Sequence, residues 1–202
     1  MSQEDVPLER AELLKKAFLG GLAVTGGFLA AGRVDLAGAS SPTAGTDLRI
    51  LNFMLYLEYM MSALYREALK KDALRGELLD FAHTASVHEQ RHVEYLQREL
   101  GDAARSQPNF DFDDITSDPA RFARTAMRLE EAVVGAYVGQ GANLTRRKAA
   151  QVAQIASVEG RHAAWIRDSL GADPAPRAAD PTMSQADVLA ALERAGLTKG
   201  KS

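Results

Sequence analysis

The 202-residue sequence contains no cysteine, which excludes disulfide bonds, thiolate zinc sites and cysteine nucleophiles. Histidine, aspartate and glutamate remain as its metal ligands. A strong charge of either sign is also missing, because 24 Lys and Arg residues oppose 27 Asp and Glu residues, for a formal net charge of -3. With no basic block in the main body of the chain, we expect no nucleic-acid partner. The 46% of apolar and 25% of charged residues are typical of a soluble globular protein.

A short apolar segment near the N-terminus is typical of an export signal. Two lysines at 15–16 precede the run AFLGGLAVTGGFLAAG, and the string AGA at 37–39 provides a cleavage pattern of the A-x-A type. The run has about 16 residues, fewer than the roughly 20 that span a bilayer, so we expect no permanent membrane anchor. We predict that residues 1–39 direct export to the periplasm, the cell envelope or the medium and are then removed. A disordered N-terminal arm is the alternative.

From Thr46 onward, hydrophobic periodicity predicts an all-α protein. Apolar residues recur at spacings of three and four, and no stretch alternates as a strand does. The four long predicted helices are 47–73, 76–100, 118–144 and 146–170. We expect a bundle domain over 40–171. Residues 172–202 then comprise a Pro/Ala linker and a short C-terminal helix at 184–195.

The second and fourth predicted helices carry one motif in the same register. HEQRHVEYLQRELG at 88–101 aligns without gaps on VEGRHAAWIRDSLG at 158–171. The first and third helices align more faintly, LEYMMSALY at 57–65 with LEEAVVGAY at 129–137. A helical hairpin therefore occurs twice, each copy with one lone glutamate and one Glu-x-x-His motif. The six residues are Glu58, Glu89 and His92 from the first hairpin, and Glu130, Glu159 and His162 from the second.

The spacing of these six residues predicts that they meet at one height in the core. In each hairpin about 30 positions separate the two glutamates, so a turn midway leaves two arms of nearly equal length. Each Glu-x-x-His motif places both side chains on one helix face, and that face is apolar. Buried, unpaired carboxylates cost several kcal/mol, so we predict two divalent cations among them. This ligand set suits two iron ions, two manganese ions or a mixed pair.

The arrangement resembles the ferritin-like proteins over residues 46–171. The strings LNFMLYLEY, VHEQRHVEYL and LEEAVVGAYVG are similar to exported bacterial ferritin-like proteins, some of which are called desiccation-related. The resemblance implies a four-helix bundle with a long crossover between its second and third helices. It also implies that Glu89 and Glu159 bridge the metal ions, with Glu58 and Glu130 as terminal ligands. A crossover of about 16 residues reaches roughly 50 Å, which exceeds the length of such a bundle.

The sequence allows alternative roles for Glu130, Tyr65 and Tyr137. Glu130 is preferred over its neighbour Glu131 by the repeat and by its apolar stripe, although Glu131 can supplement it. Tyr65 and Tyr137 lie two turns from the lone glutamates, on the same helix faces. Both tyrosines are candidates for a structural hydrogen bond to a carboxylate of a facing helix, or for a catalytic role as radical or proton relays.

Residues 88–92 also spell HExxH, the motif of zinc metalloproteases. In that interpretation His88 and His92 bind zinc and Glu89 is the general base. It needs a third protein ligand and usually a sheet, and it leaves the second Glu-x-x-His motif unexplained. We therefore place His88 beside the metal ligands or on the surface.

The predicted function is that of an exported di-metal oxidoreductase. It would oxidise Fe(II), or reduce O2 or H2O2, in oxidative or desiccation stress, as a ferroxidase, a peroxidase or a catalase-like enzyme. The alternative is a non-catalytic metal-binding or structural module of the cell envelope. The expected partners are therefore small oxidants or Fe(II). A homo-oligomer is compatible with the sequence.

Overall fold

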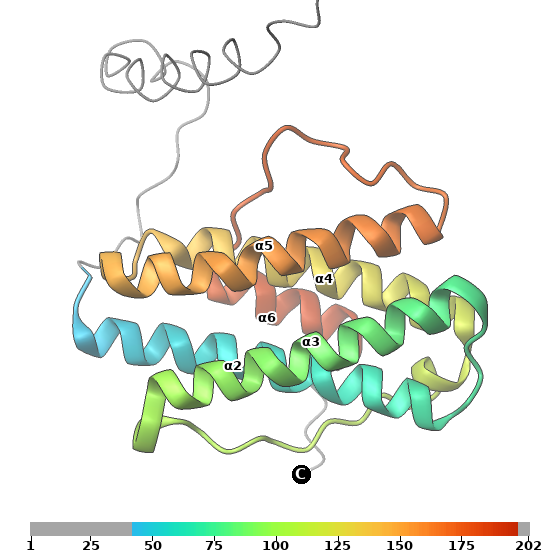
Figure 1. The fold of residues 1–202 in the computed structure, drawn as a ribbon, viewed down its shortest axis with the longest axis horizontal. Helices are drawn as coiled ribbons and strands as arrows, with labels where there is room; N and C mark the ends of the chain where they lie inside the picture. The colour runs from blue at the N-terminus through green and yellow to red at the C-terminus, as the bar shows by residue number, and fades with distance from the viewer. Residues whose placement is uncertain (1–41, 198–202) are drawn as a thin grey trace, which may run out of the picture. The chain divides into compact units, whose positions relative to one another are not determined.

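The protein folds as a helical bundle, described by a computed structural model over residues 42–197 (Figure 1). Its helices are α2 (Ala44–Lys70), α3 (Gly76–Leu100), α4 (Pro119–Gly141), α5 (Arg146–Ser169) and α6 (Gln185–Arg194). Within the described range there is no strand, so the predicted all-α class is confirmed. No helix of that range is long and apolar enough to cross a membrane. The predicted export signal at 1–39 lies outside the described residues.

Two helical hairpins build the bundle. α2 packs mainly against α3, and α4 mainly against α5, because each pair is joined by only a few residues and so must run antiparallel. The connection between the hairpins contains two short 3-10 turns, η1 (Gly101–Ala103) and η2 (Ile115–Ser117). This connection runs lengthwise along the bundle, which confirms the predicted crossover (Figure 1).

The first helix starts earlier than the sequence predicted. The predicted helix began at 47, but α2 begins at Ala44 and is capped by Thr43, whose side chain accepts a hydrogen bond from the Thr46 N–H at 3.1 Å. Asp47 is buried and instead accepts hydrogen bonds from the backbone N–H of Thr145 at 2.9 Å and its hydroxyl at 2.6 Å. Asp47 thus ties the start of α2 to the start of α5.

The core is centred on α2, which is covered on most of its sides. Its side chains Met54, Leu55, Leu57, Met60, Met61 and Leu64 are fully buried. α6 packs on α4 through the buried Val188 and Leu192 and lies behind α2 and α4, while α3 and α5 form the opposite face (Figure 1). On the face of α3 and α5, no further described helix covers the bundle.

Candidate metal centre

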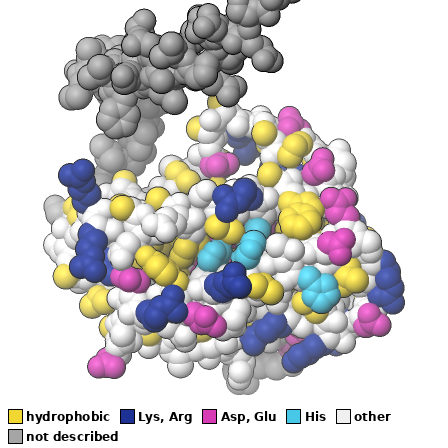
Figure 2. Space-filling view, viewed as in Figure 1, with side chains coloured by type: hydrophobic (Ala, Val, Ile, Leu, Met, Phe, Trp, Pro, Cys, Tyr) yellow, Lys and Arg dark blue, Asp and Glu magenta, His cyan; other side chains and the backbone are white. Residues whose placement is uncertain are grey.

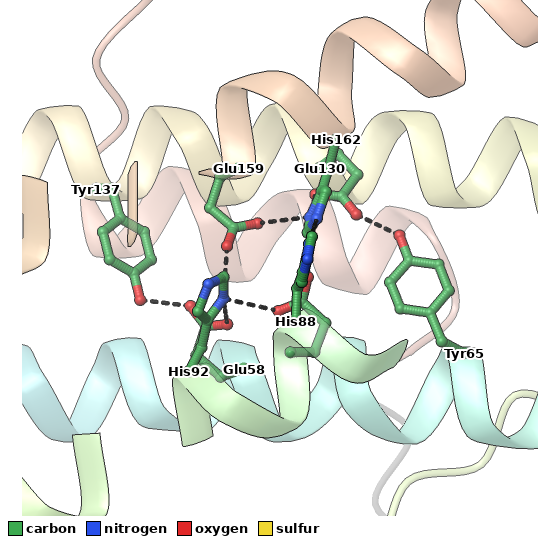
Figure 3. Close-up of polar contacts among 9 residues, drawn as sticks. Glu58, Tyr65, His88, His92, Glu130, Tyr137, Glu159 and His162 are labelled. Atoms are coloured by element: carbon green, nitrogen blue, oxygen red, sulfur yellow. Dashed lines mark hydrogen bonds and ion pairs between the residues drawn. The ribbon is translucent and has the colours of Figure 1, made fainter. Parts of the chain in front are cut away.

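The structure brings the six predicted ligands together inside the bundle (Figure 3). All four glutamates have an exposed fraction of 0%, and the two histidines are also buried. They come from all four long helices: Glu58 from α2, Glu89 and His92 from α3, Glu130 from α4, and Glu159 and His162 from α5. Each glutamate lies within the apolar stripe of its helix, so the packing that buries the stripe also buries the carboxylate.

Two overlapping groups of four residues can each hold a metal ion. One group is Glu58, Glu89, His92 and Glu159, and the other is Glu89, Glu130, Glu159 and His162. Within each group the potential ligand atoms lie within 4.8 Å of one another. Glu89 and Glu159 belong to both groups, so two adjacent cation sites would share them. A lone glutamate and one histidine complete each half.

The contacts of His92 fit a cation site better than a set of hydrogen bonds. Its Nδ1 lies 2.9 Å from an oxygen of Glu159, 3.2 Å from one of Glu58 and 3.4 Å from one of Glu89. One imidazole nitrogen offers a single hydrogen or a single lone pair, so it cannot satisfy three carboxylates. A divalent cation accepts ligands from all of them.

The second half of the cluster repeats this pattern. The Nδ1 atom of His162 lies 3.1 Å from Glu89, 3.6 Å from Glu159 and 3.8 Å from Glu130. Among the described residues, neither this nitrogen nor any carboxylate oxygen of Glu89 and Glu159 has a partner with hydrogen-bond geometry. Buried polar atoms are normally paired, so these atoms point to a ligand such as a metal ion.

Each lone glutamate is held by a tyrosine of the other hairpin. The hydroxyl of Tyr137 on α4 donates to Glu58 on α2, and that of Tyr65 on α2 donates to Glu130 on α4. Burial, followed by the nearby carboxylates, raises the pKa of both tyrosines well above the usual value. Both hydroxyls therefore keep their protons and act as hydrogen-bond donors.

The pKa shifts of the metal-free cluster favour bound protons at Glu89 and His92. Burial and then the neighbouring carboxylates raise the pKa of Glu89 well above its usual value. Burial lowers the pKa of His92, but short contacts with the carboxylates around it outweigh burial and raise the pKa to about 12. Burial raises the pKa of Glu159, but its contacts with the two histidines outweigh burial and hold the pKa at about 2. A cation must therefore displace protons.

Glu131 and His88, for which the sequence allowed a role as metal ligand, lie outside both groups. Glu131 is 37% exposed at its side chain and forms an ion pair with Arg167 of α5. It therefore points away from the cluster that contains Glu130. His88 is half-buried, and its Nδ1 lies 2.9 Å from Nε2 of His162. No candidate metal group of the described residues combines His88 with His92, so the geometry does not support the zinc-protease interpretation.

Comparison with known proteins agrees with this architecture. The family model of the ferritin-like domain matches residues 46–172, more than half of the chain. The match includes all four long helices almost completely and the crossover between them. No curated protein shows significant sequence similarity to the chain. On the family match, this chain belongs to the ferritin-like domain family.

Proposed function

We propose that this protein is a di-metal carboxylate oxidoreductase that oxidises Fe(II) or reduces O2 or H2O2. The observation that carries the proposal is that Glu89 and Glu159 are shared between two groups of potential ligands. Two iron ions, two manganese ions or one of each would be held by Glu58, Glu89, His92, Glu130, Glu159 and His162. Glu89 and Glu159 would bridge the pair.

Charge and donor type both support a pair of divalent cations. Four ionised glutamates with two neutral imidazoles carry four negative charges, which two divalent cations balance. Carboxylate oxygens and imidazole nitrogens are ligands that iron and manganese accept, and the sequence has no thiolate to favour softer metals. The same ligands, two lone glutamates and two Glu-x-x-His motifs, hold the metals in known di-iron and di-manganese bundles.

Several groups of the chain would prepare the site for a small oxidant. Bound iron or manganese would supply electron transfer at coordination positions that the protein leaves open. Tyr65 and Tyr137 orient the lone glutamates and lie close enough to hold or pass a proton. One turn from each glutamate the helix carries an apolar, buried side chain: Leu55, Ala85, Val133 and Ile155. These side chains leave little room for a bulky organic substrate.

The test is metal binding and turnover by the full chain. Anaerobic loading with Fe(II) or Mn(II) should give two equivalents per chain, and the loaded protein should speed Fe(II) oxidation or peroxide loss. A Glu89→Ala, Glu159→Ala double variant should lose both properties. The matched control is Glu94→Ala, Asp168→Ala, which removes two exposed carboxylates from the same two helices. Fewer than one equivalent bound to the wild type would contradict the metal centre.

The rates decide between an enzyme and a binding module. If the wild type binds two ions but reacts no faster than the double variant, the oxidoreductase proposal fails. A metal-binding module of the cell envelope would then remain.

We further propose that the protein is exported and acts in oxidative or desiccation stress. The paired lysines, the apolar run and the A-x-A pattern within residues 1–39 support export, and the stress role rests on the proposed chemistry with O2 or H2O2. Intact-mass analysis of the envelope and secreted fractions should find a chain that begins at Ser40. A full-length chain confined to the cytosol would contradict export.

A further inference from the structure

The two halves of the candidate centre differ at one position beside it. In the aligned repeat, the residue before the first motif glutamate is His88, and its counterpart before Glu159 is Val158. His88 lies on α3 and contacts a ligand histidine on the opposite helix α5. Val158 has no polar atom with which to do the same. The repeat is therefore asymmetric where it borders the metal ligands.

His88 is seated directly against His162. Its Nδ1 lies 2.9 Å from Nε2 of His162, the two ring centroids are 5.2 Å apart, and the ring planes differ by 11° (Figure 3). His162 is 2% exposed, whereas His88 is half-buried. Figure 2 shows histidine side chains reaching the surface near the middle of the face of α3 and α5, with Lys and Arg side chains around them.

The orientation of His162 assigns a task to each of its nitrogens. Nδ1 faces the carboxylates of Glu89, Glu159 and Glu130, so this is the atom that offers a lone pair to a cation. In a neutral imidazole the other nitrogen, Nε2, must then carry the hydrogen. That N–H is buried and needs an acceptor, and Nδ1 of His88 lies at the right distance. A partner on the distal nitrogen fixes both the tautomer and the ring orientation of a metal-binding histidine.

The other ligand histidine lacks such a partner. His92 also directs Nδ1 at the carboxylates, but among residues 42–197 no protein group hydrogen-bonds to its Nε2. Its ring is therefore held by the Nδ1 contacts and by packing, without a hydrogen bond on the distal nitrogen. Both imidazoles direct Nδ1 at the cluster, but only His162 has a hydrogen-bond partner on Nε2.

We propose that His88 is a positioning residue that accepts the Nε2–H of His162 and so makes the His162 half of the centre the tighter cation site. This inference rests on the proposed metal centre. Loss of the group that supports a metal-binding histidine typically weakens metal affinity 10- to 100-fold. We expect Mn(II) to bind the wild type in two resolved steps, with the first at His162.

The first experiment measures Mn(II) affinity under anaerobic conditions, from the electron paramagnetic resonance signal of the free ion. His88→Val installs the residue found at the equivalent position of the second motif, and it should weaken the tighter step about 10- to 100-fold. His88→Asn keeps an acceptor near the position of Nδ1 and should restore most of the affinity. His83→Val, at an exposed position of the same helix, should change nothing. Unchanged affinities in His88→Val would overturn the proposal.

A second comparison assigns the effect to one half of the centre. In a His92→Ala background, which leaves the His162 half, His88→Val should still weaken the remaining Mn(II) site. In a His162→Ala background it should have no effect. Equal losses in the two backgrounds would show a general structural role and would overturn the proposal. Circular dichroism on every variant checks that the helices persist.

Two readouts distinguish failure of the proposed function from failure of the inference about His88. A wild type that binds no Mn(II) or Fe(II) contradicts the proposed function and this inference together. Two-site binding that is indifferent to His88 contradicts only the role of His88. The nitrogen–nitrogen scalar coupling across the hydrogen bond, measured by NMR on 15N-histidine protein loaded with diamagnetic Zn(II), should link Nε2 of His162 to Nδ1 of His88. Its absence would also overturn the inference.

Discussion

At the scale of single residues, the site combines buried charges with neutral donors that orient them. A buried carboxylate with a missing donor is costly, because its desolvation is no longer compensated. The two tyrosine hydroxyls each hold one oxygen of a lone glutamate, and each tyrosine belongs to the hairpin opposite its partner. The tyrosines therefore join the two halves of the bundle at the level of the candidate metal ligands.

The first prediction is that Tyr65→Phe lowers both stability and metal affinity. The variant keeps the ring but removes the donor to Glu130, so we expect metal-free protein to lose about 1–3 kcal/mol in the free energy of unfolding. Mn(II) should also bind more weakly at the half that contains Glu130. Urea unfolding and Mn(II) titration measure the two effects. Tyr56→Phe is the control, because no hydrogen bond joins the Tyr56 hydroxyl to any other described residue. Equal unfolding midpoints for the two variants would contradict the prediction.

The six candidate ligands could be predicted from the sequence, and so could a hydrogen bond from each tyrosine to a carboxylate of a facing helix, but not which carboxylate each tyrosine contacts. The repeat identified all six because equal hairpin arms bring the motif glutamates to one height. The pairing of Tyr65 with Glu130 depends on how one hairpin is rotated against the other, and the packing of four helices decides that rotation. The contact between His88 and His162 was missed for the same reason. The one available signal was the HExxH string itself, which placed a histidine beside Glu89 that the repeat does not require.

At the scale of elements, helix existence followed from periodicity, while helix ends depended on tertiary contacts. Thr46 and Asp47 have the chemistry of helix caps, yet Asp47 is drawn to Thr145 and the helix begins three residues earlier than predicted. The crossover was predicted from the family resemblance and from the available length. The side chain that anchors the crossover, Asn52, was not predicted. It lies in the interior of a helix, and the sequence does not indicate that it contacts Ala103, 51 residues away.

Asn52 should be a strong determinant of the stability of the crossover. Its side chain donates to the carbonyl of Ala103 at 2.9 Å and accepts from the N–H of Arg105 at 2.9 Å. Asn52→Ala would leave both backbone groups without this partner, so we expect a loss of about 2 kcal/mol or more in the free energy of unfolding. Urea denaturation measures it. Gln90→Ala, which removes an exposed hydrogen bond to Glu94, should cost less than about 0.5 kcal/mol. Similar losses for the two variants would argue against anchoring by Asn52.

The C-terminal segment depends on a glycine of α4. Met183 donates its backbone N–H to the carbonyl of Gly135 at 2.9 Å, and a Cβ on Gly139 would lie only 2.9 Å from that same nitrogen. Helix propensity alone predicts that Ala is better than Gly by about 1 kcal/mol. Here the contact is with backbone, which cannot rotate aside, so we expect Gly139→Ala to destabilise the protein.

Gly160→Ala provides the matched comparison for Gly139→Ala. A Cβ on Gly160 would meet no atom within 4 Å, so helix propensity should prevail and the melting temperature should rise. Gly139→Ala should lower it. Thermal unfolding followed by circular dichroism measures both. A higher melting temperature in both variants would show that the segment around Met183 does not depend on close packing against Gly139.

At the scale of the whole molecule, the fold and the site stabilise each other only when the charges of the site are balanced. Without metal, protons do this: the carboxylates around His92 hold its pKa at about 12, and burial together with neighbouring carboxylates raises the pKa of Glu89. Four helices thus meet around a cluster that can hold either protons or cations. We therefore expect protons and cations to compete for the cluster, so that the stability of the bundle depends on both pH and metal.

The last prediction is that metal stabilises the protein more at about pH 8 than at about pH 6. The folded pKa of His92 in metal-free protein lies above its ordinary value of 6.5. The stability it contributes is therefore fully present below pH 6.5 and is progressively lost as pH rises toward 12. The raised pKa of Glu89 acts in the same direction. The lowered pKa of Glu159, about 2, adds no slope in this range.

In metal-loaded protein the cation replaces these protons, so the stability of the loaded protein does not fall as pH rises. The affinity of the protein for metal increases with pH. The difference in melting temperature between Mn(II)-loaded and chelator-treated protein should therefore widen from about pH 6 to about pH 8. Calorimetry in buffers of different ionisation enthalpy should show proton release on Mn(II) binding at pH 7. The Glu89→Ala, Glu159→Ala variant should show neither effect. A difference that stays constant or narrows at the higher pH would mean that cations and protons do not compete for this cluster.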